Sequence, residues 1–173
     1  MSVIRSIVAI VVALILQSLL AKAVGVARLP VDLVLVTVVS IALLYGRVAG
    51  LLGGSLAGLA QDAMSGGVMG IGGLSASLSG FLAGFAGTQF IVTQSGPRFM
   101  LFLGASALRS AIFMGLYSLL GLRRFDQPFF DLALLALGNA CVGVVLFWAI
   151  ERRPGVSARW RTRGERRRKG RYR

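Results

Sequence analysis

The sequence predicts an all-α integral membrane protein, built as a bundle of six transmembrane helices. Hydrophobic residues make up 56% of the 173 residues and charged residues only 14%, whereas a soluble domain has about 25% charged residues. The mean hydropathy is +0.80. No formal charge occurs in the 35 residues from 63 to 97, which is long enough for one crossing and a loop. We therefore expect a transmembrane domain over residues 1–151 and a separate tail over 152–173.

The composition also excludes several kinds of chemistry. The chain has no histidine and a single cysteine, Cys141. Zinc sites of the usual Cys/His type, a disulfide within the chain and nucleophilic catalysis through a Ser-His or Cys-His pair are therefore excluded. We expect no metal and no cofactor, and neither of these two kinds of nucleophilic catalysis.

The first helix is expected from about Ile4 to Val26. Arg5 and the apolar run after it are also typical of a signal peptide. The run is slightly long for that role, and Lys22 would lie inside the cleavage triplet. An uncleaved first crossing is therefore favoured.

The second and third helices follow closely on each other. Pro30 is expected to open the second helix, with Asp32 in its first turn and an end near Tyr45. The third helix is expected from about Val48 to Met64. It contains a row of small residues that recurs every fourth position and ends in a carboxylate: Gly46, Gly50, Gly54, Gly58 and Asp62.

A glycine-rich turn over residues 65–73 is expected to lead into a fourth helix from about Leu74 to Val92. That helix has a second small-residue row, made of Ala76, Gly80, Gly84 and Thr88. Small residues four apart let two membrane helices approach closely. The two rows are therefore expected to face each other, and the alternative use of the first row is to dock a transmembrane helix of another protein. Asp62 is either an exposed carboxylate at the helix end or a buried polar anchor paired with Arg109.

The fifth helix is expected over about 99–122, after a polar link at 94–98, and the sixth over about 132–150. Arg109 lies near the middle of the fifth helix, where an unpaired charge costs at least ~2.5 kcal/mol. It should therefore face the bundle or a polar cavity. Asp62 and Asn139 are its expected partners, with Asp32 ranked behind them.

The last segment of the chain sets the expected orientation. Residues 152–173 hold eleven of the 19 basic residues and one acid, Glu165. Positive charge favours the cytoplasmic side, so both chain ends are expected there, with the tail disordered. The tail is expected to lie on anionic lipid through these residues: Arg159, Trp160, Arg161, Arg163, Arg166, Arg167, Arg168 and Lys169. No folded nucleic-acid-binding module accompanies these arginines, so nucleic acid is not an expected partner.

Three segments, in this order, resemble one family. They are PVDLVLV at 30–36, GRVAGLLGGSLAGLAQD at 46–62 and SGGVMGIGGLSASLSGFLAG at 65–84. Together they are similar to MreD, the membrane subunit of the bacterial rod-shape (elongation) machinery, over roughly residues 25–125. One departure is Val31, which separates a proline and an aspartate that the family usually has adjacent.

The resemblance implies a non-enzymatic scaffold in the bacterial inner membrane. Such a subunit would bind MreC and would belong with the RodA glycosyltransferase, a class B penicillin-binding transpeptidase and the MreB filament. It also implies the six-helix fold of the substrate-binding subunits of energy-coupling-factor vitamin transporters. Uptake of a small molecule is therefore the alternative function, and it would require a polar pocket near the outer face. Aspartyl catalysis by Asp32 and Asp62 is disfavoured, because they lie on separate helices without a protease motif.

Overall fold

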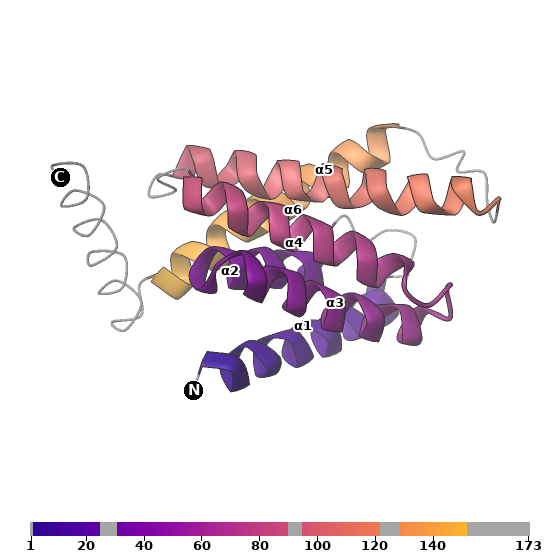
Figure 1. Ribbon diagram of the computed structural model, residues 1–173, viewed down its shortest axis with the longest axis horizontal. Helices are drawn as coiled ribbons and strands as arrows, with labels where there is room; N and C mark the ends of the chain where they lie inside the picture. Colours follow the sequence, from indigo (N-terminus) through magenta and orange to yellow (C-terminus); the bar gives the residue numbers. More distant parts are fainter. Residues whose placement is uncertain (1, 25–30, 90–94, 122–128, 152–173) are drawn as a thin grey trace, which may run out of the picture.

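The computed structural model describes residues 2–24, 31–89, 95–121 and 129–151, and within these ranges the fold is all-α, with six helices and no strand. The prediction of six helices is confirmed. Figure 1 shows them lying along one long axis, with the start of α1 and the end of α6 on the same side of the molecule. In chain order the helices are α1 (Ser2–Val24), α2 (Leu33–Tyr45), α3 (Arg47–Ser65), α4 (Ile71–Gln89), α5 (Ser95–Leu119) and α6 (Phe129–Glu151).

Helix α2 lies at the centre of the bundle. Nine of its 13 residues are buried, as expected for a helix that is apolar on all sides. Leu35 and Val39 pack in a core cluster with Phe102 of α5 and Phe147 of α6. Val34, Val38 and Ile41 of α2 pack in a second cluster with side chains of α1 and α3.

The outer helices present apolar side chains to their surroundings. Four segments are long and apolar enough to cross a membrane, namely 3–23, 71–89, 96–119 and 132–149. The first of these is only 11% buried within the protein, so most of its hydrophobic surface requires an apolar environment. These features indicate a multi-pass membrane protein. Helix α2 is shorter, and its 13 residues rise only ~19 Å against a hydrocarbon core of ~30 Å.

Several helix starts differ from the predictions. Asp32 was expected in the first turn of the second helix, but α2 begins at Leu33 and Asp32 is its N-cap. Helix α6 begins at Phe129, about three residues before its expected start. The expected polar link at 94–98 is wrong, because residues from Ser95 onward are helical. Arg98 in this first turn is 3% exposed and its guanidinium lies 4.6 Å from the ring centre of Phe147. A cation–π contact of this kind accommodates a buried charge. The expected turn at 65–73 is also too long, because Gly72 and Gly73 already belong to α4.

Candidate functional site

The centre of the glycine row lies where α3 crosses α4, the helix pair with the most extensive contact in the protein. A Cβ atom added to Gly58 would lie 2.5 Å from the carbonyl oxygen of Gly72. A Cβ atom on Gly54 would overlap the carbonyl group of Ala76 in the same way. The two backbones are therefore in direct contact at these positions, and no side chain fits between them.

Toward the start of α3, backbone contact continues at Gly50 but not at Gly46. Gly50 and Gly80 oppose each other, so that a Cβ on either would overlap the other's carbonyl oxygen. A Cβ on Gly84 would lie 2.6 Å from the Cα of Arg47. Gly46 has open space around it but a φ of +97°, so it is required for the tight connection between α2 and α3 and not for packing. At Gly50, Gly54 and Gly58 the row is thus occupied by α4, which leaves no room at these positions for a partner's helix.

Asp62 is buried, with 7% of its surface exposed, and it anchors the start of α4. Its Oδ2 accepts hydrogen bonds from the backbone N–H groups of Gly70 at 2.9 Å and Gly73 at 3.2 Å. The first N–H groups of a helix have no partner within the helix, and the helix dipole favours a carboxylate there. Gly72 has no side chain because a Cβ would overlap this carboxylate. Asp62 therefore acts as an N-cap supplied by the preceding helix.

Arg109 of α5 is 9% exposed and forms an ion pair with Asp32 at the start of α2. Its second terminal nitrogen donates a hydrogen bond to Oε1 of Gln61 at 2.7 Å. The expectation that Asp62 or Asn139 would be the partner of Arg109 is wrong. Because α2 begins only at Leu33, Asp32 lies inside the bundle and reaches the arginine.

Asp32 and Asn139 extend this ion pair into a network. Asp32 is the N-cap of α2, since its Oδ1 accepts the N–H of Leu35 at 3.0 Å. The backbone N–H of Asp32 donates to Oδ1 of Asn139 at 2.5 Å, and Nδ2 of Asn139 donates to Oγ of Ser106 at 2.7 Å. The network therefore joins α2, α3, α5 and α6. Throughout the described ranges, every buried side-chain nitrogen and oxygen has a hydrogen-bond partner.

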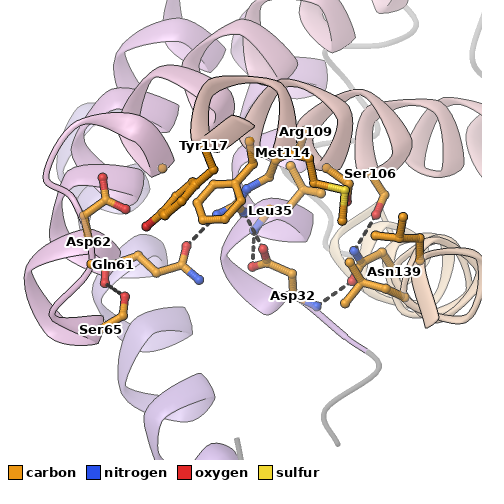
Figure 2. Close-up of a pocket in the computed structure, with 16 residues that line it drawn as sticks. Asp32, Leu35, Gln61, Asp62, Ser65, Ser106, Arg109, Met114, Tyr117 and Asn139 are labelled. Atoms are coloured by element: carbon orange, nitrogen blue, oxygen red, sulfur yellow. Dashed lines mark hydrogen bonds and ion pairs between the residues drawn. The ribbon is translucent and has the colours of Figure 1, made fainter. Parts of the chain in front are cut away.

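A cavity of about 450 Å³ lies beside this network. Figure 2 shows side chains from the ends of α2 and α3 and from α5 and α6 converging on it. The volume lies in the range of sites that hold small molecules. The polar part of the lining includes Asp32, Gln61, Asp62, Ser106, Arg109 and Asn139. The structure thus brings Asp62, Arg109 and Asn139 to one cavity, whereas Gly50, Gly54, Gly80 and Gly84 lie along the helix crossing.

Several residues of the cavity were not predicted from the sequence. Gln61 is one of them, although it is adjacent to Asp62. Ser106, Ser110 and Tyr117 of α5 also line the cavity. Together with Arg109 and Phe113 they recur every three or four residues along α5, which places them on one helix face. The polar members of that face on an otherwise apolar helix are the signal that identifies them.

Some predictions concern residues that are not part of the cavity. The tail residues predicted to bind lipid, 159–169, lie outside the ranges that the structure describes, as do residues 122–128 between α5 and α6. Among the described residues there is no cluster of three or more histidine, cysteine, aspartate or glutamate side chains that could hold a metal. Cys141 is exposed on α6.

Comparison of the chain with models of protein families, with curated proteins and with solved structures finds no match.

Proposed function

We propose that this protein is a scaffold subunit of the MreD type in the bacterial elongation complex, where it binds MreC and supports lateral peptidoglycan synthesis and cell-shape control. The observation that carries the proposal is the way the three segments of the resemblance meet in one structural unit. A scaffold needs such a rigid unit more than it needs reactive groups. No catalytic step is assigned to it.

Each of the three segments contributes a specific contact to that unit. The first segment contains the N-cap of α2, Asp32, which also binds Arg109. The second segment supplies the backbone surface at Gly54 and the carboxylate of Asp62, both of which contact α4 in the third segment. Residues that form a recognisable pattern in the sequence are therefore the same residues that hold α2, α3 and α4 together.

The remaining features of the proposal concern the membrane. We place all six helices across the inner membrane, including the shorter α2 and the less apolar α3, with both chain ends in the cytoplasm. RodA, a class B penicillin-binding transpeptidase and MreB are the proposed neighbours of the MreC complex. The basic tail is proposed to lie on anionic lipid of the cytoplasmic leaflet.

Capture from membranes tests this proposal. The full-length tagged chain is co-expressed with MreC of the same bacterium and purified in lipid nanodiscs, and an unrelated multi-pass protein with the same tag is the control. We expect MreC to be retained by this chain at a fixed ratio and not by the control. Deletion of the gene is expected to convert rods to round cells. Absence of MreC from the purified protein, together with unchanged cell shape, would contradict the proposal.

The cavity favours a second candidate function, a substrate-binding subunit for uptake of a small molecule. That function requires a polar pocket, and the fold gathers polar side chains from several helices at one place. An uptake subunit requires an ATP-hydrolysing partner module to drive transport. The same purification distinguishes the two functions, because uptake predicts that an ATPase module is retained in place of MreC.

A further inference from the structure

We infer that the cavity between α2, α3 and α4 on one side and α5 and α6 on the other binds a small, electrically neutral molecule that carries hydroxyl or carboxamide groups. The inference depends on the cavity and goes beyond the scaffold function proposed above. It holds whether or not the protein binds MreC. Under the second candidate function, the same molecule would be the transported substrate.

The position of the cavity explains why it holds a polar occupant. The rise of α2, ~19 Å, is about 10 Å shorter than the hydrocarbon core, and the cavity lies at its N-terminal end, next to Asp32. Backbone that is not helical is tolerated at membrane depth only where it is buried in protein or lines a hydrated cavity. The volume of about 450 Å³ is much larger than the ~30 Å³ share of one water molecule. The space is therefore large enough for a solute.

The charges around the cavity favour a neutral solute. Arg109 is neutralised by its ion pair with Asp32. The carboxylate of Asp62 lies on the N-terminus of α4, and the N-terminus of α2 also points to the cavity. Each helix N-terminus contributes roughly half a positive charge, so the lining is close to neutral in total. A solute with a net charge would lose its hydration without gaining an unpaired counter-charge.

Two side chains offer hydrogen bonds to such a solute. Oε1 of Gln61 is held by Arg109, which turns its amide nitrogen away from the arginine, as Figure 2 shows. Neither this nitrogen nor the hydroxyl of Ser110 makes a hydrogen bond within the ranges that the structure describes, and both residues line the cavity. An amide donor and a hydroxyl match hydroxyl and carboxamide groups. Leu35, Phe113 and Met114 form an apolar wall, so the solute also has an apolar side.

The inference is tested by affinity labelling of a thiol placed in the cavity. Ser110→Cys is introduced into the full-length chain with Cys141→Ala, in lipid nanodiscs, where both faces are accessible. Three reagents of similar size are compared: hydroxyethyl, trimethylammonioethyl and sulfonatoethyl methanethiosulfonate. Ser118→Cys is the matched control, because Ser118 lies on the same helix, is exposed and does not line the cavity.

We expect the hydroxyethyl reagent to react with the Ser110→Cys variant at a rate that saturates with concentration, which indicates binding before reaction. Relative to the Ser118→Cys control, it should react about tenfold faster than either charged reagent, because a charged group is desolvated without compensation. Adding Gln61→Glu makes the lining negative, and the cationic reagent should then become the fastest. Elution volume and melting temperature confirm that each variant is folded, and Met114→Cys replaces Ser110→Cys if the latter is not.

Three results would overturn the inference. Rates that rise linearly with concentration, in the same ratios as at the control position, would mean that the cavity holds only water. Absence of reaction with every reagent would mean that the cavity is closed. A preference for a charged reagent in the protein without Gln61→Glu would contradict the charge balance.

Discussion

At the scale of single residues, Asp32 combines two roles that require different chemistry. One carboxylate oxygen caps α2 by accepting the N–H of Leu35, and the other binds the guanidinium of Arg109. Asparagine can cap a helix as well as aspartate, but it cannot neutralise an arginine. The two roles can therefore be separated by substitution, which allows the contribution of the ion pair to be measured.

The first prediction concerns this ion pair. Arg109→Leu should lower the free energy of unfolding by about 3–5 kcal/mol, because it leaves the Asp32 carboxylate buried without its counter-charge. Asp32→Asn should have a similar effect through the unpaired arginine. The double variant Asp32→Asn with Arg109→Leu should be less destabilised than either single variant, because no buried charge remains and the N-cap is kept. Thermal unfolding of the full chain in nanodiscs measures all three.

Arg5→Leu is the matched control, since Arg5 lies in α1 and is exposed; its substitution should leave the melting temperature within the error of the parent protein. Destabilisation in the double variant equal to the sum of the two single variants would show that the two charges act independently. In that case the network around the cavity would not depend on their pairing.

The residue-level predictions were made from the position of each residue along its own helix. They succeeded for burial, which depends on that position, and failed for contacts between residues on different helices. Burial of Arg109 was expected because a charge in the middle of an apolar helix must avoid lipid. Its partner was ranked wrongly. Asp32 is 77 positions away in the sequence, and it reaches Arg109 because α2 begins at Leu33 and not at Pro30, which leaves Asp32 inside the bundle. Gln61 was missed for the same reason: its role is defined by an arginine from another helix.

At the scale of helices, α3 and α4 cross with their backbones in direct contact, and this is the most extensive contact between two helices of the protein. Contact between backbones at Gly54 and Gly58 fixes the distance between the two helices. The carboxylate of Asp62 then fixes where α4 begins. Close backbone approach favours membrane helix association, since it increases van der Waals contact where no hydrophobic effect operates between helices.

The second prediction concerns this crossing. Gly54→Ala should lower the free energy of unfolding by about 1–3 kcal/mol, since its methyl group overlaps the backbone of Ala76 and the helices must separate. Gly104→Ala in α5 is the matched control, because a Cβ at Gly104 meets nothing within 4 Å. This control should be neutral or slightly stabilising, since alanine is the better helix former by about 1 kcal/mol. Equal effects of the two substitutions would show that the crossing tolerates a wider separation.

The helices were largely predictable because apolar runs and the four-residue glycine period are local signals. The helix ends were less predictable. Arg98 marked a link in the sequence, but Phe147 of α6 provides the aromatic face that lets it enter a helix. Gly72 and Gly73 were expected in a turn, but the cap from Asp62 allows the helix to begin before them. In both cases the deciding partner lies on a different helix.

At the scale of the whole molecule, the short central α2 is surrounded by longer helices, and this difference in length creates the cavity at one end of the bundle. The connection between α3 and α4 lies at the same end as the start of α2, whereas the start of α5 lies at the opposite end, near the end of α4 (Figure 1). If the side of the membrane on which one of these connections lies is known, the side to which the cavity opens is therefore also known.

The third prediction is that the cavity opens to the outer side of the inner membrane. Eleven basic residues at 152–173 should hold the end of α6 in the cytoplasm, which places the α3–α4 connection outside. In a Cys141→Ala background, Val68→Cys in that connection should be labelled by a membrane-impermeant maleimide applied to intact spheroplasts. Gly96→Cys, at the start of α5, should be labelled only after permeabilisation. Both positions are exposed, so a difference in labelling reports the side of the membrane and not burial in the protein. The reverse pattern would place the basic tail outside and the cavity on the cytoplasmic side. It would remove the basis for contact with a cytoplasmic filament, while the ion pair between Asp32 and Arg109 and the α3–α4 crossing would be unaffected.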